Sequence, residues 1–481
     1  MNTELKFRGL SSIVLILSLV SGCTLGPDFE EPVVQSPETW QTRVAQTADL
    51  ADIEWWELFD DPILVSLVTN ALVKNRDINI AISRIAQSRA ALGFTEVDGY
   101  PRLDVEAAIN RGDFTGAGKS PTTSTNAYIA APLSWEIDFW GKFSRATEAA
   151  RADLIASEYG YKTVQLTLVS DVVSTYYQLL DFHRRLTISE NTLKSRSESL
   201  DIIQHRFDKG IISELDVNQA EIQKEIAAAA IPLYQRSISV TENSLSLLLG
   251  RLPGEIKLRD NMSEQTQPPS IPMGLPAQIL ERRPDIIQSK FQLRAQTANI
   301  GVAEALRWPA ISLTGTLGVA STELDSITVD GGVWSVGGQL LGPVFNFGQN
   351  KRRVEIEEAI TQQFLFEFEN TVLTAFREVE DALVEIQTYR MELAAIDRQL
   401  KAARNANRLS KERYDKGVSS YLEVLDTERT LFNTDLKQSE THQLYLKAYV
   451  NLYRSLGGGW VTEADREFLR EAGNAVPDQE L

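Results

Sequence analysis

The sequence of 481 residues contains one cysteine, Cys23, and only three histidines, His183, His205 and His442. A single thiol cannot form an internal disulfide or a thiolate metal cage, and the histidines are scattered without metal-ligand spacing. A glycine-rich phosphate loop and a nucleophile motif are both missing. We therefore expect neither enzyme activity nor a metal or other bound cofactor.

Clustered positive charge and long apolar runs are scarce as well. The formal net charge is −18, and we expect no surface with the clustered Lys and Arg that nucleic-acid phosphates require. After the N-terminal segment no stretch approaches 18 consecutive apolar residues, so no helix is predicted to cross a membrane. A nucleic-acid partner and a helical membrane domain are both disfavoured.

The first residues have the pattern of a secretory signal. Lys6 and Arg8 precede an apolar run from Leu10 to Val20, which is too short to remain in a bilayer as a span. Two small residues then stand directly before Cys23. We expect residues 1–22 to be removed and residues 23–55 to form an N-terminal segment; the alternative is a plain signal peptide whose cysteine is incidental.

Most of the chain consists of two related halves. Sliding the sequence against itself by 207 or 208 positions aligns Asp77 with Asp285 and Gly141 with Gly348. The run 206–210 returns at 413–417, again with an offset of 207. We predict two structural repeats at residues 56–266 and 277–460, joined by a proline-rich linker at 267–276 and followed by a tail at 461–481.

Each half contains a very long predicted helix and a returning one. The windows 142–209 and 349–416 contain no proline and a single glycine. A second helix, capped by serine, follows after Gly210 and after Gly417. Each half therefore forms a helical hairpin with its tip at the glycine, and the two hairpins cover residues 142–250 and 349–457. Pro232 should interrupt and kink the first returning helix. A seven-residue frame typical of coiled coils is kept by Val172, Tyr176, Leu179, Leu186, Leu193, Leu200 and Phe207, and by Val372, Phe376, Val379, Leu383, Ile386, Leu393 and Leu400.

Before each long helix the apolar period changes to two. Alternating residues predict two strands in each half, near 102–135 and near 310–341. Strands with one apolar and one polar side are typical of transmembrane barrels, although any one of them alone could belong to a soluble hairpin. Four strands cannot close such a barrel, because the smallest have about 8 strands. We therefore predict that several chains share one barrel.

Together these features resemble the outer-membrane factors of the TolC type, in the lipoprotein branch that serves multidrug efflux. The resemblance is carried by Ser21-Gly22-Cys23, Trp55-Trp56, the tip run 421–426 and the closing run 457–460. It implies a mixed α+β membrane protein: a homotrimer whose chains each add four strands to a 12-stranded β-barrel and long coiled-coil hairpins to an α-barrel. It also implies outer-membrane localisation, extension into the periplasm and a covalent lipid on Cys23.

The function implied by the resemblance is an exit duct for passive, gated export of small toxic compounds. Its implied partners are outer-membrane lipid, a periplasmic adaptor (membrane fusion) protein and an inner-membrane pump of the resistance-nodulation-division class. The alternatives are a duct for type I protein secretion and a periplasmic coiled-coil lipoprotein scaffold without a pore.

The resemblance places the periplasmic gate at Leu422 and Asp426. Three copies of Asp426 around an axis would attract cations, while a ring of Leu422 would resist wetting. Leu215 and Gln219 occupy the matching places in the first half, so only one hairpin carries the acidic position. Adaptor contact or simple hairpin closure would explain the tip residues Gly210, Ile211, Ile212, Gly417, Val418 and Ser419 equally well.

Overall fold

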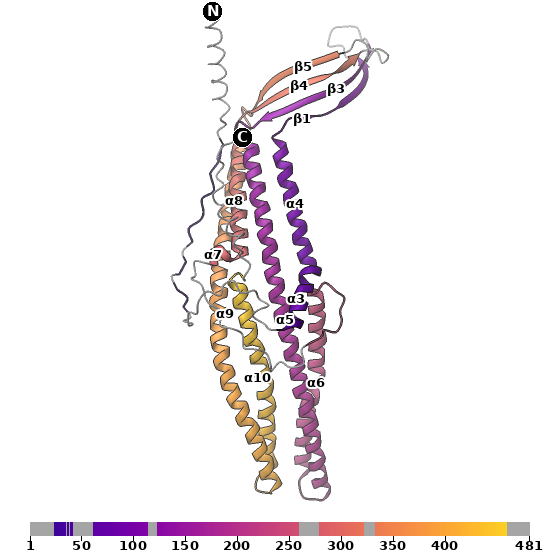
Figure 1. The fold of residues 1–481 in the computed structure, drawn as a ribbon, viewed down its shortest axis with the longest axis vertical. Helices are drawn as coiled ribbons and strands as arrows, with labels where there is room; N and C mark the ends of the chain where they lie inside the picture. Colours follow the sequence, from indigo (N-terminus) through magenta and orange to yellow (C-terminus); the bar gives the residue numbers. More distant parts are fainter. Residues whose placement is uncertain are drawn as a thin grey trace, which may run out of the picture. The chain divides into compact units, whose positions relative to one another are not determined.

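The computed structural model describes residues 24–34, 36–37, 39–41, 61–113, 123–258, 279–321 and 332–458 (Figure 1). The predicted signal peptide, Cys23, the linker and the tail lie outside these residues. The chain divides into two compact units: Met1–Val33, Ser83–Glu158 and Gln288–Asn370 form one, and Val34–Ile82, Tyr159–Ile287 and Thr371–Leu481 form the other. Both units take segments from both halves of the sequence, so neither unit is a single repeat.

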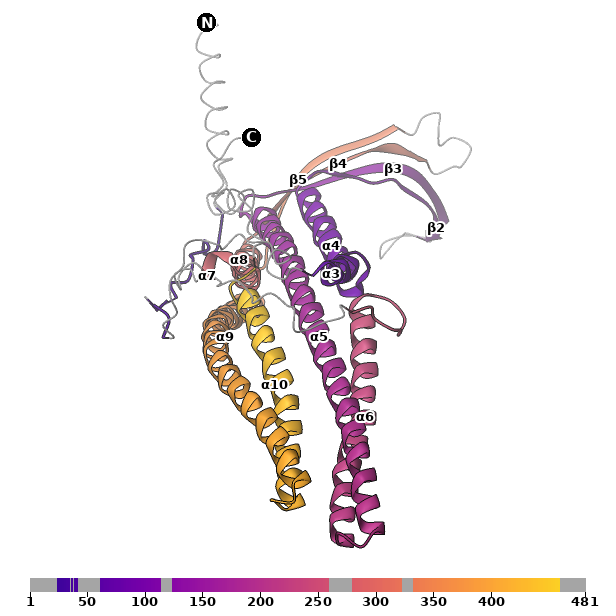
Figure 2. The ribbon, with the colours of Figure 1, turned by 60° about the horizontal axis from the view of Figure 1, so that its bottom comes forward.

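The first unit contains an antiparallel sheet. Strands β1 (Arg102–Leu103) and β2 (Glu106–Asp113) pair with β3 (Thr123–Ile137), β3 pairs with β4 (Ala310–Ser321), and β4 pairs with β5 (Gly332–Leu341). Figures 1 and 2 show β3, β4 and β5 side by side. The predicted strands of both halves therefore share one sheet.

The first predicted strand is interrupted, so the sheet has five strands where four were expected. Leu103 pairs with Leu133 and Glu106 pairs with Ala130, so β1 and β2 keep one register along β3. The gap lies opposite Pro132, which has no backbone N–H to donate to Asp104, although the Asp104 amide still donates to the Pro132 carbonyl over 3.0 Å. The proline thus breaks the ladder without shifting it.

The sheet has one apolar and one polar face, as the alternation predicted. Residues paired directly across antiparallel strands point to the same side. The exposed fractions of Leu317, Trp334 and Val336 are 70%, 78% and 82%, so much of the apolar face is uncovered within one chain. That face carries Leu103, Ala107, Ile109, Ile129, Ala131, Leu133, Trp135, Leu313, Leu317, Val319, Trp334, Val336 and Leu340.

The helices repeat in matched pairs. The long helices α5 (Lys142–Asp208) and α9 (Gln349–Asp415) each have 67 residues, and the returning helices α6 (Glu214–Leu248) and α10 (Tyr421–Ser455) each have 35. Shorter helices precede the strands: α3 (Pro62–Lys74), α4 (Arg76–Asp98), α7 (Ile279–Arg282) and α8 (Pro284–Ala305). In Figures 1 and 2, α6 returns along α5 and α10 returns along α9.

Pro232 lies inside α6, and the interruption predicted there was wrong. The proline removes one helical hydrogen bond, whereas the helix around it is held by burial of Ala227, Tyr234 and Ile238. None of the described helices combines the length and the apolar character needed to span a membrane.

The seven-residue frame forms the core of the second unit. Val172, Tyr176 and Leu179 of α5 are fully buried, and they share a cluster with Leu245 of α6 and Val450 of α10. Buried residues of the α9 frame are Val372, Val379, Leu383 and Leu400. Burial of a large apolar side chain contributes about 1.5–3 kcal/mol, so this frame is the main source of cohesion along the helices.

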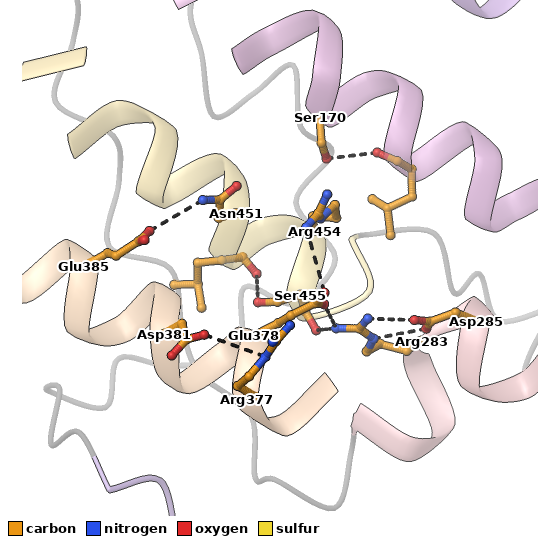
Figure 3. A network of polar contacts seen from close by, with 12 residues as sticks. Ser170, Arg283, Asp285, Arg377, Glu378, Asp381, Glu385, Asn451, Arg454 and Ser455 are labelled. Atoms are coloured by element: carbon orange, nitrogen blue, oxygen red, sulfur yellow. Dashed lines mark hydrogen bonds and ion pairs between the residues drawn. The ribbon is translucent and has the colours of Figure 1, made fainter. Parts of the chain in front are cut away.

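The root of each hairpin is closed by one side chain from the preceding helical segment. Asn75 donates through Nδ2 to the carbonyl of Leu248 over 2.9 Å, and Arg283 donates through Nη1 to the carbonyl of Ser455 over 3.0 Å. Figure 3 shows Arg283 at this point, also paired with Asp285 at 2.7 Å and with Glu378 of α9 at 2.8 Å. The two roots are equivalent in sequence but use different chemistry.

Candidate functional site at the hairpin tips

Both hairpin tips turn on a glycine in the left-handed conformation. The φ angles of Gly210 and Gly417 are 68° and 71°. The amide of Ile211 donates to the carbonyl of Arg206 over 3.0 Å, and the amide of Val418 donates to the carbonyl of Arg413 over the same distance. These bonds satisfy carbonyls at the ends of α5 and α9, so the predicted positions of both turns are confirmed.

The returning helices begin as the serine caps predicted. Ser213 is the N-cap of α6, and its amide donates to Asp216 Oδ2 over 3.2 Å. Ser420 is the N-cap of α10. An acidic residue in the first turn of each helix favours this start through the helix dipole.

The two tips pack against each other through a small apolar cluster. Its buried members are Ile203, Ala220, Tyr421, Val424 and Leu425, and Ile212 packs at its margin. The cluster joins α5 and α6 to the first turns of α10. The tip of the second hairpin is therefore held by the first.

The predicted gate residues lie on the opposite, exposed side of α10. Leu422 is 62% exposed, and Asp426 follows one turn later on the same side. Asp426 Oδ1 lies 2.7 Å from Arg429 Nη2, and both side chains are 61% exposed. Arg429 was not among the predicted site residues, although its spacing of three residues from Asp426 is a signal that could have identified it.

Ion pairs surround the packed cluster. Arg206 of α5 lies 3.2 Å from Asp415 of α9, and its guanidinium stacks 4.8 Å from the centre of the Tyr414 ring. Lys411 lies 2.7 Å from the buried carboxylate of Glu428. The first of these contacts links the two hairpins directly.

Arg196 of α5 is a further cation near the tips that sequence reasoning did not identify. Only 3% of the residue is exposed, its Nη1 donates to the carbonyl of Gln223, and its guanidinium lies 5.0 Å from the centre of the Phe432 ring. Burial lowers the pKa of Arg196 from its ordinary value, and the nearby Glu428 partly opposes this. A charged group inside a coiled coil has no signature in the apolar frame, which is why the pattern did not indicate it.

The other predicted site residues divide between exposed and packed positions. Ile211 and Val418 are 67% and 62% exposed, whereas Ile212 is half-buried against the apolar cluster. Ser419 is half-buried. Ile212 therefore serves hairpin packing, and the two strongly exposed apolar residues are Ile211 and Val418.

Nothing in the described ranges forms a metal centre. No group of three or more His, Cys, Asp or Glu side chains in these ranges could hold a metal ion. His183 and His442 are half-buried, and burial lowers the pKa of both. Cys23 lies outside the described residues.

The profile of the family described as outer membrane efflux protein matches residues 67–251 and 275–458. The solvent efflux pump outer membrane protein SrpC of Pseudomonas putida is 34% identical over 469 residues, which cover 95% of this chain and 99% of SrpC. The probable outer membrane lipoprotein SilC of Salmonella typhimurium is 31% identical over 466 residues, with 95% and 99% covered.

Solved structures agree with these matches. The structure of the outer-membrane channel OprN superposes with a TM-score of 0.82 at 29% identity and covers 92% of this chain and 100% of that chain. The resemblance to TolC-type channels is thereby confirmed, together with the expected fold, outer-membrane location and role in efflux. The chain belongs to the family of outer membrane efflux proteins.

Proposed function

We propose that three copies of this chain form one passive, gated duct through which small toxic compounds leave the cell. The single observation that carries this proposal is the two-faced sheet, whose apolar side is largely uncovered and whose strand β5 pairs only with β4 among the described strands. Open edges are not tolerated in lipid, so neighbouring copies must pair β5 with the other edge of the sheet. Three copies of this sheet close into a barrel.

The proposed gate is the exposed side of α10 at its first turns. Leu422 and Asp426 face away from the cluster that holds the tip, so three copies can approach one axis through these residues. Because Asp426 pairs with Arg429, the proposed ring carries both signs of charge, which differs from the purely acidic ring implied by the resemblance. The constriction depends on the balance between these two residues.

Channel recordings with purified protein in planar bilayers test both the duct and the gate. We expect Asp426→Ala to raise single-channel conductance, since it removes one side of the Asp426–Arg429 pair at the narrowest point. Asp426→Ala should also make the pore less cation-favouring, and Arg429→Ala should make it more so, as read from the reversal potential.

Gln219→Ala provides the matched control, because Gln219 is the counterpart of Asp426 on the first hairpin. This variant should leave conductance unchanged. Unaltered conductance in Asp426→Ala would remove Asp426 from the gate. Complete absence of conductance steps in the unmodified protein would favour the pore-free scaffold.

The adaptor and pump are proposed from the family and from the tips. Ile211 and Val418 each place an apolar side chain at the end of a hairpin, where exposure to water is unfavourable. A periplasmic adaptor that covers both tips would remove this exposure and connect the duct to an inner-membrane pump of the resistance-nodulation-division class. Ile211→Asp combined with Val418→Asp should abolish capture of the adaptor and leave the trimer intact.

A lipid on Cys23 is proposed from the Ser21-Gly22-Cys23 motif and from the similarity to SilC, which is named as a probable outer membrane lipoprotein. Mass spectrometry of the mature protein should give the mass of residues 23–481 with acyl chains attached. Cys23→Ala should lack this added mass.

A further inference from the structure

Residues 24–28, here called the strap, occupy a cradle at the junction between the sheet and α5. The amide of Leu25 donates to the carbonyl of Trp140 over 3.3 Å. Arg145 donates through Nε to the carbonyl of Leu25 over 3.1 Å and pairs with Asp28 at 2.7 Å. The Arg145 side chain is only 6% exposed as a result.

Glycines make room for the strap. A Cβ added to Gly301 of α8 would lie 2.6 Å from the carbonyl oxygen of Leu25 and 2.8 Å from Cγ of Arg145. A Cβ added to Gly141 would lie 2.7 Å from Thr24 Cγ2. Gly141, Arg145 and Gly301 therefore form a first cradle that fits a peptide backbone.

The residues of this cradle have counterparts in the other half of the sequence. An offset of 207 from Gly141 and Arg145 leads to Gly348, just before α9, and to Arg352 of α9. An offset of 208 from Gly301 leads back to Gly93 of α4. Arg352 contacts Glu355 as Arg145 contacts Glu148, one turn further along the helix in each case. In the proposed trimer, Gly348 and Arg352 of one copy and Gly93 of its neighbour would together form a second cradle.

No described residue fills the second cradle. A Cβ added to Gly93 or to Gly348 would meet nothing within 4 Å, and the Arg352 side chain is 76% exposed. A glycine in the interior of a helix is unfavourable by about 1 kcal/mol relative to alanine. The described residues of each chain include one such strap, so three second cradles per trimer are left for another ligand.

Both cradles lie at the same end of the sheet. In the register, Ile137 at the end of β3 pairs with Ile311, and Ile311 pairs with Leu340 near the end of β5. The chain enters α5 five residues after Ile137 and enters α9 nine residues after Leu340. Thr24, which touches Gly141, directly follows the proposed lipid attachment at Cys23, so this end of the sheet lies at the membrane surface.

The second cradle is more cationic than the first. Lys351, Arg352 and Arg353 are consecutive and exposed, where the first half has Ser144, Arg145 and Ala146. The absence of cationic clusters inferred from the sequence is thus wrong at this one place, because a net charge of −18 hides a run of three residues. Ser144 is exposed even though the strap fills the first cradle beside it. Its counterpart Lys351 should therefore also stay accessible after a neighbouring copy completes the second cradle.

Aromatic side chains adjoin these cations. Phe345 and Phe347 are 76% and 90% exposed, and their ring centres lie 4.5 Å apart. Apolar rings beside exposed cations suit the boundary between acyl chains and headgroups. A strap brings its own carboxylate and needs one arginine, whereas a phosphodiester in a membrane surface suits several cations.

We propose that the second cradle binds the headgroup phosphate of an anionic phospholipid in the inner leaflet of the outer membrane, one molecule per chain. Arg352 donates to the phosphate where Arg145 donates to the strap. Lys351 and Arg353 supply the additional positive charge, and Phe345 contacts the acyl chains. This site rests on the proposed trimer, because Gly93 comes from the adjacent copy.

Native mass spectrometry of the full-length trimer with phosphatidylglycerol or zwitterionic phosphatidylcholine tests the site. We expect up to three phosphatidylglycerol molecules to remain bound under conditions that remove phosphatidylcholine. Lys351→Gln, Arg352→Gln and Arg353→Gln together should weaken phosphatidylglycerol binding on the order of 100-fold, from roughly tenfold or less per cation. The charge-conserving triple variant Lys351→Arg, Arg352→Lys and Arg353→Lys should retain most of the binding.

The matched control replaces three exposed cations of the same unit, Arg84, Arg89 and Arg151, by glutamine, and should bind phosphatidylglycerol like the unmodified protein. Equal retention of both lipids by the unmodified trimer, or full retention in the 351–353 glutamine variant, would overturn the proposal. So would a peptide mass bound in place of lipid. Failure of every variant and of the unmodified chain to give trimers would refute the proposed duct instead.

Discussion

Single glycines close the helices of this chain under two different constraints. Gly210 and Gly250 have similar φ angles, 68° and 66°. Nothing lies within 4 Å of a Cβ added to Gly210, whereas a Cβ added to Gly250 would lie 2.2 Å from the carbonyl oxygen of Lys74. The first position needs glycine for its conformation alone, and the second also needs it for close approach.

This difference predicts unequal effects of the same substitution. Gly210→Ala should lower stability by about 1–2 kcal/mol through backbone strain. Gly250→Ala should lower it by a further 1–3 kcal/mol or so, because the backbone of α3 must move. Thermal unfolding of the purified protein would measure both, and equal melting temperatures for the two variants would contradict the close approach at Gly250.

His442 makes stability depend on pH. Burial, followed by the nearby Arg184, lowers the pKa of His442 from its ordinary value of about 6.5, while Asp397 opposes this. As pH falls below about 6.5 the unfolded chain binds the proton first, so stability is lost toward acid pH until the folded pKa is passed. Melting temperatures from pH 7 to pH 5 should fall less in His442→Gln than in the unmodified chain; parallel curves would exclude His442 as a source.

The sequence predicted the roles of those residues whose effect depends only on the neighbouring backbone. Gly210, Gly417, Ser213 and Ser420 act through the backbone next to them, which is why their roles could be predicted. Arg196 depends on Gln223 and Phe432 from two other helices, so no local pattern reports it.

The first turns of α10 are divided between a packed and an exposed side. Tyr421 is 6% exposed inside the tip cluster, and the adjacent Leu422 is 62% exposed. The start of the helix therefore combines an adhesive side toward the first hairpin with a free side proposed to line the gate. A substitution that weakens packing on the buried side should therefore also change the mobility of the exposed side.

Tyr421→Ala and Leu422→Ala test this division. The tyrosine variant should lose about 3–5 kcal/mol of local stability, and the leucine variant less than about 0.5 kcal/mol. Hydrogen exchange of the amides near 203 and 421–425 should accelerate strongly in the first variant only. Similar acceleration in both would show that the cluster does not hold the tip.

Long periodic segments were predicted well, and their interruptions were not. Both 67-residue helices begin at the predicted residue, because a sustained apolar frame and the lack of proline act over their whole length. The break between β1 and β2 depends on a proline in the partner strand, and the continuity of α6 depends on packing around Pro232. Both outcomes are decided by neighbours that sequence periodicity does not identify.

The complete duplication makes one chain a template for contacts between chains. Trp140 and Trp308 stack with ring centres 4.8 Å apart inside the first unit. Their counterparts in the other half are Phe347 and Tyr100, which are 90% and 67% exposed. In the proposed trimer these two residues should meet across the subunit boundary.

Cysteine cross-linking would detect this contact. Tyr100→Cys combined with Phe347→Cys should give trimers on oxidation, whereas Trp140→Cys combined with Trp308→Cys should give only an internal link within a monomer. Each single variant is the control for nonspecific oxidation. Absence of higher bands in the Tyr100 and Phe347 double variant would argue against the equivalence of the two junctions.

The offset of the duplication, read from sequence alone, correctly related the tips, the hairpin roots and the strand-to-helix junctions. It did not show which copy of each feature is occupied. Gly141 and Gly348 are equivalent in sequence, yet only Gly141 meets the strap, because the chain has a single N-terminus. This asymmetry arises from the N-terminal strap, which has no counterpart in the second half, so the alignment of the two halves could not predict it.

The equal lengths of α5 and α9, and of α6 and α10, limit how this protein can change in evolution. One added heptad in α5 alone would leave its seven extra residues without an opposing row on α6 and would carry one tip past the other. Growth or shrinkage is tolerated only when all four helices change by the same number of heptads. Related sequences should therefore gain or lose the same number of heptads in all four helices. The length that the hairpins span is then inherited as a single coupled property.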